Sequence, residues 1–328
     1  MVAALAFIAT FAAAALGTYT VLAWLRRRAI LDHPNERSSH RIPTPRGAGL
    51  AVVPVILIIW ALLAAIGEAP SGVWMAGLIA LALMLVSWID DRRGLPPAVR
   101  LTAHIAAAVV GIMAFPANAL IFQGLLPPAI DHVVAAIVWI WFINLYNFMD
   151  GIDGITAVET AAIGVGVAAI AAIQSGTDLS AALTIVAAGF GFLIWNWHPA
   201  RIFLGDSGSV PLGFLLGWLL LSLAARGAWA AAMILPAYYL ADATITLIAR
   251  AAAGEAVWKA HRRHFYQIAL RGGASHTAVV LRIAFANLLL ILLALVSKEQ
   301  PWLAVAGAGV VVAALLGELL RMSRVRPS

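Results

Sequence analysis

Long apolar stretches follow one another along almost the whole chain. An α-helix needs ~20 apolar residues to cross a bilayer. Eleven stretches approach that length, at about 2–25, 47–66, 73–89, 99–115, 132–149, 155–173, 180–195, 209–225, 228–249, 279–297 and 301–320. They lack the alternation of the ~10-residue strands that build a membrane β-barrel. The pattern predicts an all-α, polytopic integral membrane protein with about 11 transmembrane helices.

The composition agrees with a protein that is solvated largely by lipid. Hydrophobic residues make up 63% of the chain and charged residues 11%, whereas a soluble domain carries about 25% charged residues. The chain contains no cysteine, which excludes disulfides, thiolate nucleophiles and cysteine-ligated metals. Any metal must therefore be held by oxygen or histidine ligands.

The positive charges predict how the chain is oriented. The segments that follow the odd-numbered stretches contain 19 of the 21 Lys and Arg residues, and such residues gather on the cytoplasmic side. We expect the N-terminus outside and the C-terminus in the cytoplasm. The net charge of +6 comes from basic residues in the segments that set the membrane orientation. We therefore expect no nucleic-acid partner.

No linker or low-complexity tract divides the chain, so residues 1–328 are predicted to form a single integral membrane domain. Its external connections are short. The polar segments predicted on the cytoplasmic side lie near 26–46, 90–98, 144–154, 196–208 and 250–278.

Two of these polar segments hold closely spaced acidic and amide side chains. Asp90 and Asp91 are adjacent; such carboxylates repel each other, so they suit a base or a metal partner, although a solvated helix end explains them too. Asn144, Asn147, Asp150 and Asp153 are spaced three apart. On a helix or tight turn they share one face, which suits a polar site or a helix-packing seam.

The segment before the eighth stretch indicates a phosphate site. Ser207 or Ser209 can cap a helix that starts here, and its free amides and dipole then favour an anion. Asp206 beside this helix start suggests a metal that bridges to phosphate. A simple capped helix after a turn remains the alternative.

The sequence His261-Arg262-Arg263-His264 lies in the last large polar segment. It suits either an electrostatic patch for anionic lipid or a grip on a pyrophosphate, with Arg as a bidentate donor. Asp242, inside the ninth stretch, either organises helix packing or supports the site. Phosphoryl transfer from a nucleotide to a lipid needs carboxylates that bind Mg²⁺ and groups that bind phosphate. The acidic segments, the helix start and this basic loop together provide them.

Taken together, the motifs resemble those of the polyprenyl-phosphate N-acetylhexosamine-1-phosphate transferases, the MraY/WecA superfamily or glycosyltransferase family 4. The resemblance covers nearly the whole chain. It rests on the first loop (32–49), Asp90-Asp91, the segment 144–154, Phe203 to Gly208, Asp242 and the His/Arg loop.

The resemblance implies that undecaprenyl phosphate attacks the β-phosphate of a UDP-linked N-acetyl sugar and releases UMP. It assigns catalysis to Asp90 and Asp91, and Mg²⁺ or Mn²⁺ to Asp206 and Asn147. Direct attack, with Asp90 keeping the lipid phosphate deprotonated, is the mechanism we favour, and a covalent aspartyl intermediate stays open. The substrate-binding positions implied are Asn144, Asp150, Asp153, Asn196, Phe203 (on uracil), His261, Arg262 and His264.

Departures from the peptidoglycan-precursor branch favour another substrate. The chain has His-Arg-Arg-His in place of three histidines, and no run of Lys follows the paired aspartates. It is more similar to the branch that initiates O-antigen and other surface polysaccharides, especially the members that use 6-deoxy-N-acetylhexosamines. The particular sugar, the prenyl length and a homodimer stay open.

Two other classes compete with this interpretation. CDP-alcohol phosphotransferases also use an Asp-x-x-Asp-Gly, but in them it continues to Ala-Arg and a second pair of aspartates, whereas Ile-Thr-Ala-Val-Glu follows Gly154. An ion-coupled transporter holds carboxylates near the midplane of the membrane. Only Asp242 supports that class.

Overall fold

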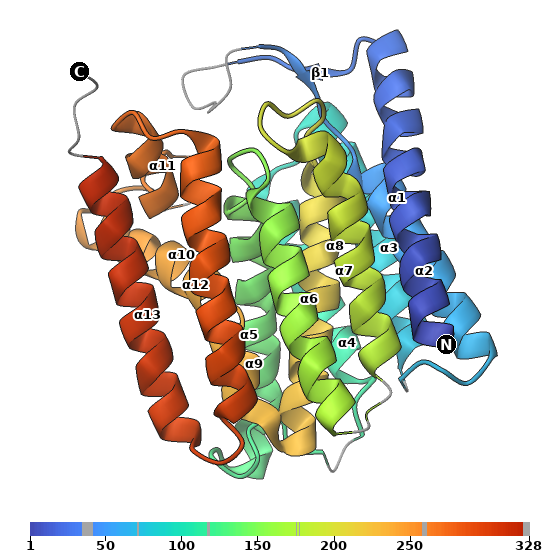
Figure 1. Cartoon of the computed structure of the whole chain (residues 1–328), viewed down its shortest axis with the longest axis vertical. Coiled ribbons are helices and arrows are strands. Elements are labelled where there is room, and N and C mark those ends of the chain that lie inside the picture. The colour runs from blue at the N-terminus through green and yellow to red at the C-terminus, as the bar shows by residue number, and fades with distance from the viewer. Residues whose placement is uncertain are drawn as a thin grey trace.

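The computed structural model describes residues 1–34, 42–70, 72–116, 119–174, 176, 178–257 and 261–323. These parts are almost entirely helical, which confirms the predicted all-α class (Figure 1). Sequence features at 35–41, 258–260 and 324–328, including much of the first-loop motif, lie outside the described residues. The helices are α1 (Val2–Arg27), α2 (Gly49–Ala65), α3 (Val73–Arg93), α4 (Pro97–Ile112), α5 (Pro128–Phe148), α6 (Ile155–Ile173), α7 (Asp178–Asn196), α8 (Asp206–Leu223), the π-helical turn η1 (Ala224–Ala228), α9 (Trp229–Ile234), α10 (Ala237–Ala252), α11 (Phe265–Arg271), α12 (His276–Val296) and α13 (Pro301–Met322).

The helix lengths confirm a polytopic membrane protein. Among the described residues, 8 helices are long and apolar enough to cross a bilayer: α1, α3, α5, α6, α7, α8 continued through α9, α12 and α13. Helices α2 and α4 are apolar but shorter, with 17 and 16 residues. The count of eleven crossings stays a prediction.

The single span expected over 228–249 is wrong. The chain forms α9 up to Ile234, turns, and starts α10 at Ala237. Pro236 sits in the turn, and a proline has no amide hydrogen for an intrahelical bond and clashes with the preceding turn. The apolar pattern continues through this break because both helices pack into the bundle.

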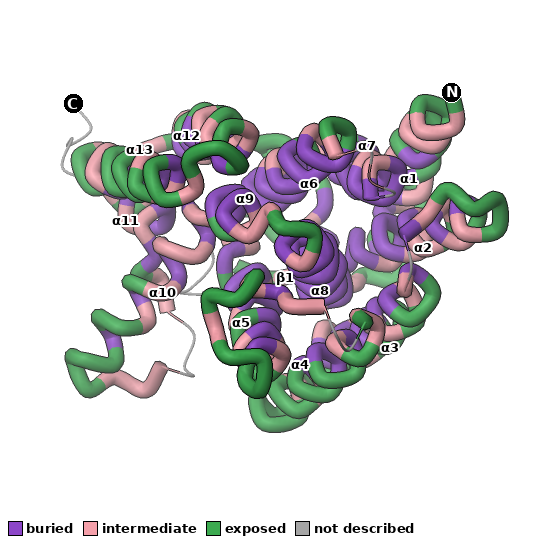
Figure 2. The backbone as a smooth tube through the Cα atoms, turned by 90° about the horizontal axis from the view of Figure 1, so that it is seen from below, coloured by how far each residue is buried: buried purple, intermediate pink, exposed green. Residues whose placement is uncertain are grey.

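Helix α8 forms the centre of the bundle (Figure 2). In an 18-residue apolar window of the span that begins with α8, 94% of the residues are buried, compared with 22% in the corresponding window of α1 at the edge. Glycine allows α8 to pack closely against α2: a Cβ on Gly49 would lie 2.2 Å from the backbone nitrogen of Gly208. The outer helices therefore face lipid, and α8 is held from all sides.

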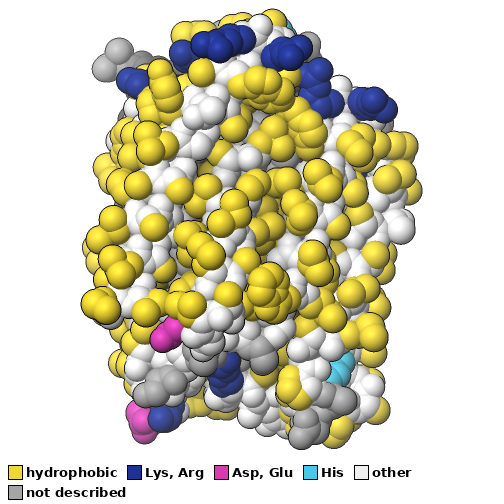
Figure 3. Space-filling model, turned by 90° about the vertical axis from the view of Figure 1, so that its right-hand side faces the viewer, with side chains coloured by type: hydrophobic (Ala, Val, Ile, Leu, Met, Phe, Trp, Pro, Cys, Tyr) yellow, Lys and Arg dark blue, Asp and Glu magenta, His cyan; other side chains and the backbone are white. Residues whose placement is uncertain are grey.

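The two ends of the bundle differ in charge. Lys and Arg side chains gather along the upper edge in Figure 3, above a broad hydrophobic surface. The start of α1 and the end of α13 lie at opposite ends of the bundle (Figure 1), as an odd number of crossings requires. This arrangement agrees with the predicted orientation.

The first loop and the loop between α7 and α8 are joined by backbone hydrogen bonds at the basic end. The strands β1 (Leu31–Asp32) and β2 (Thr44–Pro45) pair antiparallel. Phe203 donates its N–H to the Pro45 carbonyl over 2.8 Å, and its own carbonyl accepts the N–H of Gly47 over 3.0 Å. These bonds fix the start of α8 against the first loop.

Candidate active site

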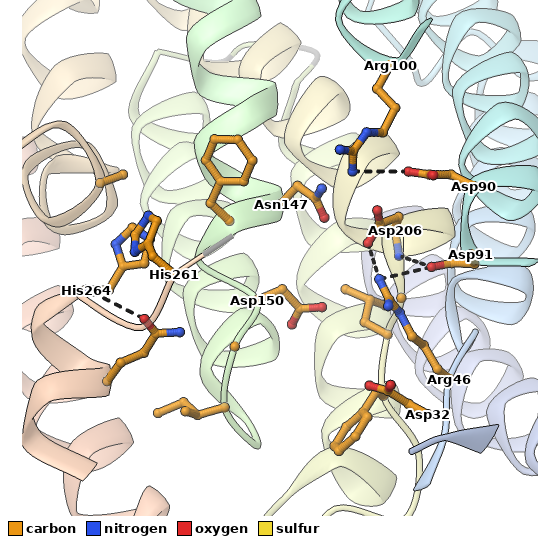
Figure 4. A pocket seen from close by; sticks show the side chains of 18 of the residues that line it. Asp32, Arg46, Asp90, Asp91, Arg100, Asn147, Asp150, Asp206, His261 and His264 are labelled. Carbon is orange, nitrogen blue, oxygen red and sulfur yellow. Dashed lines mark hydrogen bonds and ion pairs between the residues drawn. The ribbon is translucent and has the colours of Figure 1, made fainter. Parts of the chain in front are cut away.

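A cavity of about 590 Å³ opens where α8 begins, between the ends of α3 and α5 and the middle of α10 (Figure 4). It brings together most of the residues that the sequence singles out. Those that line it are Asp90, Asp91, Asn147, Asp150, Asp153, Asn196, Phe203, Asp206, His261 and His264.

Two of the predicted site residues do not line the cavity, Asn144 and Arg262. Asn144 donates its Nδ2 to the Ile140 carbonyl, one turn earlier in α5, over 2.7 Å. Helix α5 ends at Phe148, so the three-residue spacing does not keep all four polar side chains on one face. The substrate-binding roles of Asn144 and Arg262 stay predictions.

Asp91 caps the central helix α8. Its Oδ1 accepts the N–H of Asp206 over 3.0 Å, and its Oδ2 accepts the N–H of Ser207 over 2.9 Å. Gly205, at φ 77°, makes the turn before the helix, and a Cβ there would lie 2.8 Å from Asp91 Oδ2. The expected cap by Ser207 or Ser209 is wrong: a carboxylate from α3 holds the amides that were predicted to meet an anion.

Arg46 joins the two acidic segments. Its guanidinium contacts Asp206 Oδ1 and lies 3.1 Å from Asp91 Oδ1. Burial alone would lower the pKa of Arg46, but Asp206, Asp91 and two further carboxylates raise that pKa above its usual value. A permanent positive charge thus lies between the aspartates.

Asp90 points into the same cavity from the last turn of α3. Its Oδ1 accepts the N–H of Leu95 over 2.6 Å, and its Oδ2 lies 3.4 Å from Arg100 Nη1. The side chain of Asp90 is only 7% exposed. The adjacent aspartates therefore have different partners: Asp91 holds α8, and Asp90 faces the cavity beside Arg100.

The donors predicted for a metal are oxygen atoms of Asp206 and Asn147. Asn147 Oδ1 accepts the Ser209 hydroxyl over 2.6 Å, so its amide oxygen is directed toward the start of α8. Asp150, nearby in the cavity, accepts the Thr156 hydroxyl over 2.6 Å. Burial raises the pKa of Asp150 to about 6. Carboxylate and amide oxygens are the donors that Mg²⁺ and Mn²⁺ prefer, so this set fits either ion.

On the opposite wall, Asp153 is surrounded by hydrogen-bond donors. Its Oδ2 lies 2.6 Å from His198 Nδ1 and 3.4 Å from His276 Nδ1, and accepts the Ala200 N–H over 3.1 Å. Burial alone would raise the pKa of Asp153, but the bonds from the two histidines lower it below its usual value. The ligand atoms of these three side chains lie within 4.8 Å of one another, yet the hydrogen bonds already satisfy the carboxylate without an ion.

Asn196 braces this wall of the cavity. Its Oδ1 accepts the Gly154 N–H over 2.9 Å, and its Nδ2 donates to the Ile202 carbonyl over 3.0 Å. The loop after α5 is thereby tied to the loop after α7.

Residues 73–224, which run from α3 to the end of α8, match glycosyl transferase family 4. A decaprenyl-phosphate N-acetylglucosaminephosphotransferase from Mycolicibacterium smegmatis is 30% identical over 82% of this chain and 77% of its own length. The chain belongs to the polyprenyl-phosphate N-acetylhexosamine-1-phosphate transferase superfamily. The family predicted from the sequence motifs is thereby confirmed.

Other members of this superfamily are similar over shorter or less identical stretches. A Bacillus subtilis protein described as a probable undecaprenyl-phosphate N-acetylglucosaminyl 1-phosphate transferase is 25% identical over 83% of this chain and 79% of its own length. A phospho-N-acetylmuramoyl-pentapeptide-transferase from Gloeothece citriformis is 27% identical over 60% of this chain and 58% of its own length. The similarity to the N-acetylglucosamine enzymes extends over more of the chain.

Sequence reasoning assigned no site role to four cavity or cavity-wall side chains: Arg46, Arg100, His198 and His276. Arg100 contributed only to the charge that predicts the orientation of the chain, and Arg46 contributed to that charge and to the first-loop motif. For Arg100, the signal in the sequence was a basic residue a short distance after the paired aspartates. His198 lies in the polar segment 196–208, whereas nothing in the sequence around His276 connects it to Asp153.

Proposed function

We propose that this protein transfers a sugar 1-phosphate from a UDP-N-acetylhexosamine, or its 6-deoxy form, to undecaprenyl phosphate. An oxygen of the lipid phosphate attacks the β-phosphorus of the donor, the bond from that phosphorus to the bridging oxygen breaks, and UMP leaves with this oxygen. The observation that carries the proposal is the cavity at the basic end of the bundle, which six aspartates from four separate segments line: Asp32, Asp90, Asp91, Asp150, Asp153 and Asp206. The family of the chain supports it.

Asp90 is the residue best placed to act on the lipid phosphate. It lies in the cavity at the end of a membrane helix, where the headgroup of a bilayer lipid lies. We assign it the removal of the proton that the lipid phosphate still carries. Asp91 is committed to the amides of α8, which argues against an aspartyl intermediate at that residue and for direct attack.

The donor nucleotide is assigned to the wall formed by the loops after α5 and α7. Phe203 lines the cavity there and offers a face for stacking on uracil. Asp206 and Asn147 would hold Mg²⁺ or Mn²⁺, which when bound offsets the negative charge that develops on the departing UMP.

The biological setting belongs to the same proposal. We assign the protein to the bacterial inner membrane, with the cavity on the cytoplasmic face. The product then initiates a lipid-linked surface polysaccharide such as the O-antigen of lipopolysaccharide. Asp242 contacts His264 at the cavity, so the one observation in favour of a transporter is accounted for by the enzyme.

The direct test is turnover by purified protein in vesicles that contain undecaprenyl phosphate. A panel of UDP-sugars is added with Mg²⁺, and UMP and lipid-linked sugar are measured. We expect both products with at least one UDP-N-acetylhexosamine, loss of both in Asp206→Asn, and a raised KM for the UDP-sugar in Phe203→Ala. Glu299→Gln, an exposed acidic change far from the cavity, is the control. No UMP release with any UDP-N-acetylhexosamine would overturn the proposal.

A further inference from the structure

Another cavity, of about 360 Å³, lies on the outer face of α3 at the basic end of the bundle. The residues that line it come from the last two turns of that helix: Trp88, Ile89, Arg92 and Arg93. Pockets of ~300–1,000 Å³ commonly hold small ligands, and this volume falls in that range. None of the four residues lines the active-site cavity, so the two cavities are separate.

Two tryptophans join the ends of α1 and α3 at this cavity. The ring centroids of Trp24 and Trp88 lie 6.1 Å apart. The guanidinium carbon of Arg92 lies 5.9 Å from the centre of the Trp88 ring, which is a cation–π distance. Tryptophan rings favour the headgroup level of a bilayer. The cavity therefore lies at the depth where the phosphates of membrane lipids lie.

The arginines around the cavity have no acidic partner. Arg92 and Arg93 are exposed, and neither forms a salt bridge with any residue that the structure describes. Asp90 and Asp91 precede them in the chain but are paired with other arginines. The end of α1 adds further exposed arginines within four residues of its tryptophan. Positive charge without a carboxylate partner suits an anionic ligand.

An apolar stripe leads from this cavity along the outside of α3. Its members Leu81, Leu85 and Ile89 are 37%, 52% and 45% exposed. Residues four apart lie on one face of a helix, so these side chains form a line that ends beside Arg92 and Arg93. The outer face of α3 is thus apolar at the depth of acyl chains and positive at the depth of phosphate. A lipid with a negative headgroup matches both parts.

We propose that the ends of α1 and α3 bind an anionic phospholipid of the surrounding bilayer, with its phosphate beside Arg92 and Arg93 and its acyl chains along the apolar stripe. The negative charge offsets the repulsion between the adjacent guanidinium groups. The same turn of α3 carries Asp90, which faces the active-site cavity, and Asp91, which caps α8. The bound lipid therefore stabilises the turn from which both aspartates extend.

Competition between two lipids tests the site. Delipidated protein in detergent is mixed with equal amounts of phosphatidylglycerol, which is anionic, and phosphatidylcholine, which is neutral, and native mass spectrometry counts the bound lipids. We expect the wild type to retain phosphatidylglycerol preferentially, and the double variant Arg92→Gln/Arg93→Gln to lower that preference about tenfold.

The matched control is the double variant Arg271→Gln/Arg321→Gln. It removes two exposed arginines from the same end of the bundle, at α11 and α13, and should keep the wild-type preference. An equal loss in both double variants would show that only net charge matters and would overturn the proposal. Equal retention of the two lipids by the wild type would overturn it as well.

Hydrogen exchange at 88–95 tests the effect on α3. At about ten times its Kd, a lipid that must leave before the turn opens slows exchange by about tenfold. We expect this slowing with phosphatidylglycerol in the wild type and not in Arg92→Gln/Arg93→Gln. Unchanged exchange in the wild type would refute the stabilisation of the turn.

Two other phosphate sources separate the bilayer lipid from its competitors. Inorganic phosphate at the same concentration should leave the exchange unchanged, because it has no acyl chains to bind the stripe. An equal effect of inorganic phosphate would assign the cavity to a free anion, and an effect of undecaprenyl phosphate alone would assign it to the lipid acceptor; either result overturns the proposal. No readout involves turnover, so the inference stands or falls separately from the proposed function.

Discussion

Arg46 places a guanidinium where the sequence predicts a divalent cation. It contacts Asp206, the assigned metal ligand, and Asp91, the cap of α8. A metal that binds Asp206 must compete with this ion pair, since both positive groups need the same carboxylate oxygen. The competing arginine balances the buried negative charge when no cation is bound.

The competition predicts a gain of metal affinity on removal of the arginine. Arg46→Gln should bind Mn²⁺ about tenfold more tightly than the wild type, which corresponds to about 1.4 kcal/mol, as measured by electron paramagnetic resonance without nucleotide. Arg100→Gln is the matched control: it removes a positive charge from the same cavity, but the native Arg100 pairs with Asp90 and not with Asp206. Equal affinities in the two variants would show that only net charge matters.

Asp150 and Asp153 lie three residues apart but titrate in opposite directions. Burial raises the pKa of Asp150 to about 6, so the folded state binds its proton more tightly and stability falls as pH rises from about 4 to 6. The pKa of Asp153 is lowered, so its contribution is present above the usual carboxyl pKa and is lost only in stronger acid.

Neutral amides at these positions should therefore change stability with opposite signs. At pH 7.5, Asp150→Asn should raise the thermal midpoint in detergent and Asp153→Asn should lower it. For Asp150, a pKa shift of roughly two units corresponds to a gain of up to about 3 kcal/mol in the free energy of unfolding. The gain in Asp150→Asn should disappear near pH 4, where the wild-type carboxyl is protonated as well. Changes of the same sign in both variants would contradict the assigned protonation states.

At the scale of elements, α8 depends on α3 for its first turn. A helix start leaves amides that need acceptors, and Asp91 supplies them from a neighbouring helix. Asp91→Ala should speed amide hydrogen exchange at 206–209 by roughly 5–30-fold, because losing a cap costs about 1–2 kcal/mol. Asp90→Ala, one residue away, removes no α8 cap. Faster exchange in both variants would indicate a general loosening of α3.

Helical periodicity predicts where polar side chains point only as far as the helix extends. The spacing of Asn147, Asp150 and Asp153 correctly predicts that they meet, but for a different reason than a shared helical face. Helix α5 stops at Phe148, and the loop turns the two aspartates into the cavity. Sequence periodicity carries information only while the helix lasts, so the placement of Asn144 could not be predicted from it.

For the whole molecule, hydropathy predicted the all-α membrane class because lipid leaves the backbone few alternatives. The positive charges were also predicted correctly to gather at one end of the bundle, as Figure 3 shows for Lys and Arg side chains. Two long-range pairs were not predictable: Arg46 with Asp206, and His276 with Asp153. Each pair joins elements far apart in sequence, and only the packing of the helices brings them together.

The orientation of the whole bundle yields a prediction that the composition makes easy to test. The chain has no cysteine, so a single introduced thiol is the only target for a maleimide. Lys298 lies between α12 and α13, at the end of the bundle opposite to the basic edge, and Arg27 ends α1 at that edge; both are exposed. If the basic end faces the cytoplasm, a membrane-impermeant maleimide should label Lys298→Cys in intact spheroplasts and Arg27→Cys only after lysis. The reverse labelling would place the cavity outside the cell, beyond the reach of a cytoplasmic UDP-sugar, and would refute the cytoplasmic site.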